Sequence, residues 1–126
     1  KAGAALPKEY SREDAVYNLS RSGLMTASLF SGELQNLRVA VQDRIHQPYR
    51  SSLIDHYDDV FRMSYELGSL GTYVSGAGPT IIAMIDSENA GAFSKNCISH
   101  LEDKGIDGWR VELLSAAQSG AKIVIE

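Results

Sequence analysis

Hydrophobic residues recur every three or four positions in the first part of the chain, which is the spacing of one face of an α-helix. Ser11 and Asp14 resemble a capping box at the start of this stretch, and Gly32 is a natural stop. We therefore predict a first helix between Ser11 and Gly32. The apolar positions at helical spacing are Val16, Leu19, Gly23, Ala27 and Phe30, with Leu24 widening the stripe.

Three more helices follow from the same periodicity. The second begins at residue 33 and should end before Pro48, because a residue preceding a proline is pushed out of helical geometry. Residues 47–52 then form a loop. A third helix is predicted over residues 57–67 and a fourth over residues 88–104, each followed by a glycine that can end it.

Two pairs of strands complete the pattern. Residues 71–85 contain two β-rich runs on either side of a small-residue loop. Residues 109–113 and 121–125 alternate between apolar and polar side chains, which is typical of strands with one covered face. Short connections favour antiparallel pairing. We predict one α+β domain over residues 1–126: an antiparallel four-stranded sheet with helices packed on one face, most similar to a ferredoxin-like fold.

Composition narrows the function classes. The net charge of −4 argues against broad binding to nucleic acid or to an anionic membrane. The longest apolar run, near residues 80–85, is too short to span a bilayer. The single cysteine, Cys97, excludes an intrachain disulfide and indicates a reducing compartment, which we expect to be the cytoplasm. The chain opens at Lys1 without an initiator methionine, which permits a longer gene product.

The loop Ser75-Gly76-Ala77-Gly78-Pro79 is the most informative motif, because almost no side-chain bulk covers its backbone. It forms either a simple hairpin connection or a platform that lets a ligand approach main-chain N–H groups. Pro79 stiffens the loop, and the apolar run 81–85 suggests that a buried central strand anchors it. It lacks the lysine of a phosphate-binding P-loop, so it is not a nucleotide-binding signature alone.

Arg50 is the second candidate. Most arginines are solvated surface residues. Here, however, the preceding Pro48-Tyr49 pair is expected to hold the backbone of Arg50 extended, and a fixed guanidinium binds a carboxylate or a phosphate through two parallel hydrogen bonds. The three histidines have no metal-ligand spacing, and no nucleophilic triad can be assembled. We therefore assign no catalytic and no metal-binding residue.

Three segments, in order, carry a resemblance to a known family: residues 6–10 (LPKEY), 42–50 (QDRIHQPYR) and 75–80 (SGAGPT). Together they resemble the C-terminal half of proteins in the GHMP family of small-molecule kinases, specifically those that phosphorylate the amino acid L-homoserine. The resemblance covers essentially the whole chain. It implies phosphoryl transfer from ATP, with Mg²⁺, to the side-chain hydroxyl of L-homoserine, a step in threonine biosynthesis.

The resemblance also implies residue roles. In this family an arginine after the Pro-Tyr pair holds the substrate carboxylate, which matches Arg50. The Ser75-Gly76-Ala77-Gly78 loop would support the loop that holds the nucleotide phosphates. A second substrate-binding arginine is often present near the start of this region, where this chain has Gly3. The family's main phosphate-binding segment lies in an N-terminal lobe that is absent here, so we expect the fragment alone to be inactive.

Two alternatives stay open. A different GHMP kinase would act on another small alcohol, and an arginine facing the pocket would argue against it. A non-catalytic, ferredoxin-like regulatory or binding module would use the loop as a plain hairpin and bind its ligand on a sheet face or at a dimer interface. The expected partners are L-homoserine, ATP and the N-terminal lobe; a homodimer is left open.

Overall fold

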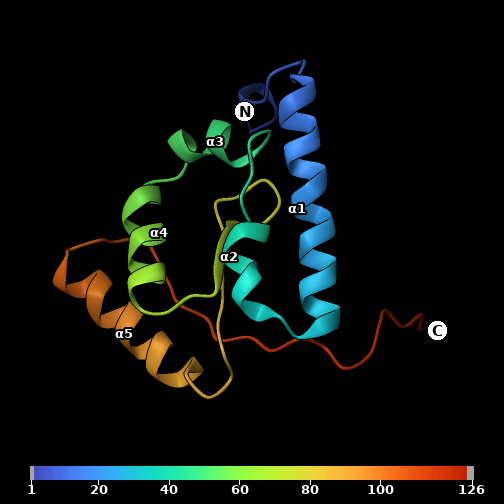
Figure 1. The fold of residues 1–126 in the computed structure, drawn as a ribbon. Helices are drawn as coiled ribbons and strands as arrows, with labels where there is room; N and C mark the ends of the chain where they lie inside the picture. The colour runs from blue at the N-terminus through green and yellow to red at the C-terminus, as the bar shows by residue number, and fades with distance from the viewer. Residues whose placement is uncertain (1, 125–126) are drawn as a thin grey trace.

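The computed structural model describes residues 2–124 and shows an α+β arrangement in which a short β-hairpin lies between helices (Figure 1). In chain order, its elements are η1 (Ala2–Ala5), α1 (Arg12–Ser31), η2 (Leu34–Asn36), α2 (Leu37–Ala40), α3 (Gln47–Arg50), η3 (Ser51–Leu53), α4 (Tyr57–Glu66), β1 (Gly71–Val74), β2 (Ile81–Met84) and α5 (Ala90–Asp103), where η denotes a 3-10 helix.

The predicted first helix is confirmed as α1. The backbone N–H of Asp14 donates to the hydroxyl of Ser11 at 3.0 Å, and Gly32 ends the helix at φ +76°. Its predicted apolar face is not part of the core, since Leu19 is 71% and Phe30 is 91% exposed. The reason is that α1 packs against η2 and α2 through a different side, where Ser28 is buried.

The predicted second helix is wrong in length. Helix α2 ends at Ala40, and the chain then turns instead of continuing to Pro48. The turn forms because the carboxylate of Asp43 accepts backbone N–H groups that a longer helix would have used. The predicted loop 47–52 is also wrong: it holds α3 and η3, with Pro48 in the first turn, where a missing N–H is tolerated. Arg50 is therefore helical rather than extended.

The third and fourth predicted helices are confirmed as α4 and α5, within two residues at most ends. Asp58 and Asp59 lie in the first turn of α4, where negative charge interacts favourably with the helix dipole. Val60 and Met63 of α4 form the main core with three side chains of α5, and β2 packs against it. The α5 residues are Phe93, Cys97 and Leu101.

The hairpin around the glycine loop is confirmed. Strands β1 and β2 pair antiparallel, with Gly71 opposite Met84 and Val74 opposite Ile81. Neighbouring β1 residues contact different helices: a Cβ on Gly71 would meet Val41 beside α2, whereas Thr72 bonds to Ser64 of α4. Because successive residues of a strand face opposite sides, helices contact both faces, and the predicted one-sided layer is wrong. Strand β2 is only half-buried, not the buried central strand that was expected.

The two C-terminal strands are not observed in the part of the chain that the structure describes. Residues 109–124 have no strand, and Ile125 lies outside the described range. The side chain of Ile123 is 92% exposed. An alternating segment becomes a strand only when a sheet edge accepts it, and the outer edge of β1 is closed. There, the N–H groups of Thr72 and Val74 donate to the side chains of Tyr65 and Gln47.

None of the helices formed by residues 2–124 has the length and apolar character needed to cross a bilayer.

Candidate functional site

The glycine loop forms a tight connection between β1 and β2. The N–H of Ser75 donates to the carbonyl of Thr80 at 2.8 Å, and the N–H of Gly78 donates to the carbonyl of Ser75 at 2.9 Å. Gly76 and Gly78 both have positive φ, +53° and +74°, as predicted for a turn built from glycine. The Gly78–Pro79 peptide bond is cis. The loop is therefore a hairpin connection. Whether it also serves as a platform for a ligand depends on the contacts that its residues make.

Gly78 is the residue with least room in this loop. A Cβ built on it would lie 3.1 Å from Cδ1 of Ile54 and 3.2 Å from Cγ1 of Val74. Gly76, in contrast, would meet nothing within 4 Å. The N–H groups of Gly76 and Ala77 make no backbone hydrogen bond within residues 2–124, and both residues are exposed. Exposed, unpaired main-chain donors are the groups with which such a loop contacts an anion or another loop.

Arg50 lies against this loop. Its Nη1 donates to the carbonyl of Ala77 at 3.0 Å, so the two predicted site elements are in direct contact. The residue is only 6% exposed, and its Nε is buried without a hydrogen-bond partner in the described chain. No acidic side chain within residues 2–124 forms an ion pair with it. Arg50 is therefore a buried cation for which the described part of the chain supplies no countercharge.

The helix that carries Arg50 is held by the carboxylate of Asp43. This carboxylate accepts backbone N–H bonds from Ile45 at 2.8 Å, His46 at 3.1 Å and Gln47 at 2.5 Å. The side-chain amide of Asn18 on α1 donates to it at 2.8 Å. Burial raises the pKa of Asp43, but these four hydrogen bonds together outweigh it and lower the pKa below its usual value of 3.8. The carboxylate therefore stays ionised at neutral pH.

Gln47, at the start of α3, ties this segment to the hairpin. Its Oε1 accepts the N–H of Val74 at 2.8 Å, and its Nε2 donates to the carbonyl of Val41 at 3.0 Å. Asp43 and Gln47 were not predicted as site residues. The sequence signal for this turn is an aspartate four residues before α3, in a segment that was predicted to be a loop.

The segment at the N-terminus approaches the same region. Element η1, which includes Gly3, lies beside α3 (Figure 1). Gly3, which the resemblance marks as the position of a second arginine, therefore belongs to an element in contact with the helix that carries Arg50.

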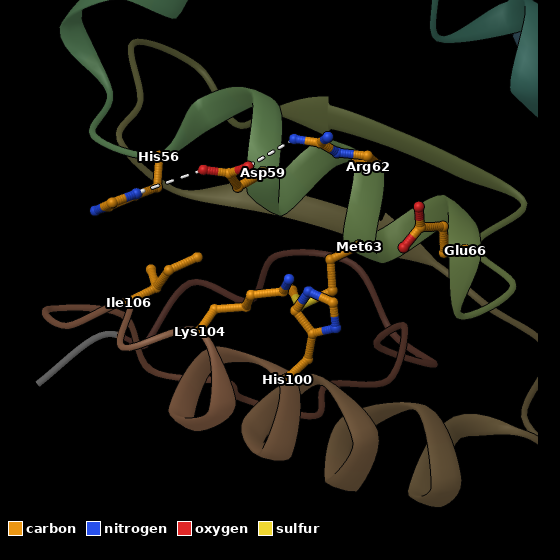
Figure 2. A pocket seen from close by; sticks show the side chains of 8 residues that line it. All are labelled: His56, Asp59, Arg62, Met63, Glu66, His100, Lys104 and Ile106. Atoms are coloured by element: carbon orange, nitrogen blue, oxygen red, sulfur yellow. Dashed lines mark hydrogen bonds and ion pairs between the residues drawn. The ribbon is translucent and has the colours of Figure 1, made fainter.

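Two hollows are present in the described chain, and neither is lined by the glycine loop. A groove of about 290 Å³ between α4 and α5 is drawn in Figure 2, where Met63 and His100 point toward one another and Asp59 bridges His56 and Arg62. A more open hollow of about 440 Å³ near α3 has aromatic walls that include Tyr57, whose pKa is raised to about 12, mainly by burial. Neither hollow includes Arg50 or a residue of the loop.

Candidate metal ligands and the free thiol add no chemistry. Among residues 2–124, no three His, Cys, Asp or Glu side chains are grouped so as to hold a metal ion. Cys97 is buried in the core, and burial raises the pKa of its thiol to about 11, so it is not a reactive thiolate.

The chain is similar to known proteins in its family, in its sequence and in its structure. The family model described as GHMP kinases C terminal matches residues 24–103. A homoserine kinase of Clostridium botulinum (strain Alaska E43 / Type E3) is 47% identical over 124 residues, which is 98% of this chain and 41% of that protein. A homoserine kinase of Synechococcus sp. is 40% identical over 97% of this chain and 40% of its own length.

A solved structure agrees with the sequence matches. The crystal structure of homoserine kinase from Cytophaga hutchinsonii superimposes with a TM-score of 0.73 at 30% identity, covering 82% of this chain and 33% of that one. The chain thus spans well under half the length of each of these relatives.

Proposed function

Because this chain belongs to the GHMP kinase family, as its C-terminal domain, we propose that it is the C-terminal lobe of a homoserine kinase. The complete protein would transfer a phosphoryl group from ATP to the side-chain hydroxyl of L-homoserine, giving O-phospho-L-homoserine for threonine biosynthesis. The relatives that support this share nearly the whole length of the chain.

The observation that carries the proposal is the uncompensated charge of Arg50. A buried guanidinium with an unpaired Nε is unfavourable unless an anion pairs with it. The carboxylate of an amino-acid substrate is such an anion and accepts two parallel hydrogen bonds from a guanidinium. The contact with Ala77 holds the charge beside the glycine loop. Arg50 therefore binds the substrate carboxylate in this account.

The loop has a second role in the proposal. Ser75, Gly76, Ala77 and Gly78 would support the phosphate-binding loop of the missing lobe, and the exposed N–H groups of Gly76 and Ala77 are suited to that contact. ATP supplies the phosphoryl group and Mg²⁺ stabilises its charge. The described residues offer no cluster of metal ligands, so the N-terminal lobe would hold Mg²⁺ and most of the ATP. The fragment alone should then show no turnover in a coupled ATPase assay with homoserine.

The predicted four-stranded, ferredoxin-like sheet belongs to the complete protein in this proposal. The outer edge of β1 is closed by Tyr65 and Gln47, so further strands can be added only beyond β2. Residues 109–113 alternate as such a strand would. We propose a cytoplasmic location from the single cysteine of this chain, and we keep a homodimer as a prediction that light scattering tests.

The alternatives are distinguished by Arg50. Another GHMP kinase with a substrate lacking a carboxylate would have little use for a buried, unpaired guanidinium next to the loop. A non-catalytic module would not need the loop to contact a fixed cation. Arg50 lines neither of the hollows described above, so the preference for the homoserine assignment over both alternatives rests on its burial and on its contact with the loop.

The test is substitution of Arg50 in the complete enzyme. Arg50→Ala should raise the KM for homoserine strongly. The rise should correspond to a loss of about 1.5–3 kcal/mol of binding free energy, because one charge-assisted bidentate contact is lost. The KM for ATP should change little. Arg110→Ala is the matched control, since the Arg110 side chain is exposed and pairs only with Glu112 in the described chain. Equal losses for homoserine and ATP would contradict the role.

A further inference from the structure

Helix α3 cannot be stable by itself. It has four residues, and a single helical turn fixes several dihedral angles for very few hydrogen bonds. Its position in the fold must therefore come from groups outside it. These groups also determine where Arg50 points, since Arg50 is its last residue.

The first such group is the carboxylate of Asp43. The N–H groups at the start of a helix have no partner within the helix. Here the N–H of Gln47, the first residue of α3, and those of Ile45 and His46 just before it all donate to Asp43, which the amide of Asn18 fixes to α1. The same Asn18 accepts the N–H of Arg44 at 3.0 Å. The start of α3 is thus anchored to the longest helix of the chain.

The second group is the side chain of Gln47. Residues 47 and 50 are three positions apart, so they lie on the same side of the turn. Gln47 accepts from the N–H of Val74 at the end of β1, and Arg50 donates to the carbonyl of Ala77 within the loop. One side of α3 therefore contacts the hairpin at two points, the end of β1 and the glycine loop.

We propose that Asp43 is a positioning residue for substrate binding, which acts by fixing α3 so that Gln47 and Arg50 hold the glycine loop. This inference rests on the proposed function, in which Arg50 binds the substrate carboxylate. Asp43 touches neither substrate nor ATP in this account, and its effect on homoserine passes entirely through Arg50.

The experiment is a double-mutant cycle in the complete enzyme, with homoserine KM, ATP KM and kcat measured for Asp43→Asn, Arg50→Ala and the double variant. Asparagine keeps the size of aspartate but places an N–H₂ group where N–H donors now converge. Asp43→Asn should raise homoserine KM roughly tenfold, the effect of misaligning a charge-assisted contact. In the Arg50→Ala background the same substitution should change KM less than about twofold. Asp55→Asn, at an exposed aspartate, is the control.

Each outcome decides one point. Equal effects of Asp43→Asn in both backgrounds, or no effect in either, overturn the positioning role. Parallel losses of homoserine and ATP affinity do the same, because they indicate general disruption. Arg50→Ala by itself reports on the proposed function separately. If Asp43→Asn does not unfold cooperatively, Asn18→Ala is compared in the same two backgrounds, since it removes one donor to Asp43 and leaves the three backbone bonds.

Discussion

Gly78 is subject to two constraints that exclude any residue with a side chain. Its φ of +74° is a conformation that side-chain-bearing residues seldom adopt, and a Cβ there would crowd Ile54 and Val74. The neighbouring Gly76 has only the first constraint. The shape of the loop, and with it the carbonyl that Arg50 holds, therefore depends most on Gly78.

We expect Gly78→Ala to lower the free energy of unfolding by about 1–3 kcal/mol, because strain and crowding add. Gly76→Ala should cost about 1 kcal/mol, the conformational term alone. Gly23→Ala, inside α1 with nothing within 4 Å of the new Cβ, should instead stabilise by about 0.5–1 kcal/mol. Urea unfolding of the three variants measures this order, and a Gly78→Ala variant as stable as Gly76→Ala would show that the crowding is absent.

At the residue scale, the sequence located Arg50 and residues 75–78 but not what holds them. Glycine permits positive φ and proline fixes φ, so the loop could be predicted from local chemistry. The roles of Asp43 and Gln47 depend on contacts with Asn18 and Val74, 25 and 27 positions away in the chain. These two long-range contacts have no local signal in a single sequence, whereas the bonds from residues 45–47 to Asp43 do.

At the element scale, α1, α4, α5 and the hairpin follow their periodicity and caps, whereas the region from Glu33 to Ser52 does not. There the apolar spacing continues, but the N–H groups of residues 45–47 donate to the carboxylate of Asp43. Because these groups are not available to a continuous helix, the side-chain contact overrides the periodicity. The apolar stripe of α1 shows the converse: its spacing predicted the helix correctly and its burial wrongly. Periodicity does not reveal which surface a helix packs against.

This difference has a consequence for stability. Leu37→Ala on α2 should destabilise the fragment by about 2–5 kcal/mol, because Leu37 is 2% exposed and its removal leaves a cavity. Leu19→Ala on α1 should change stability by less than about 0.5 kcal/mol, because Leu19 is already solvated. Thermal and urea unfolding of both variants provide the comparison. A large loss for Leu19→Ala in the isolated fragment would mean that the stripe of α1 is buried in solution.

At the scale of the whole molecule, the proposed function makes this chain one part of a larger active site. It covers 41% of the Clostridium relative, and it presents a buried cation, a loop with exposed N–H groups and no metal-ligand cluster within residues 2–124. Phosphoryl transfer depends mainly on positioning and charge stabilisation. In the proposed function, the rigid loop and the fixed arginine would position the substrate, and the other lobe would supply the nucleotide.

The most direct test pairs a change in the enzyme with a matching change in the substrate. In the complete protein, phosphorylation of L-homoserine is compared with that of aminopropanol, which lacks only the carboxylate, for the unaltered enzyme and for Arg50→Ala. If Arg50 binds the carboxylate, each change alone should lower kcat/KM by roughly tenfold or more, and both together should lower it hardly further. Losses that multiply, with aminopropanol penalised equally in both enzymes, would show that Arg50 does not contact the carboxylate.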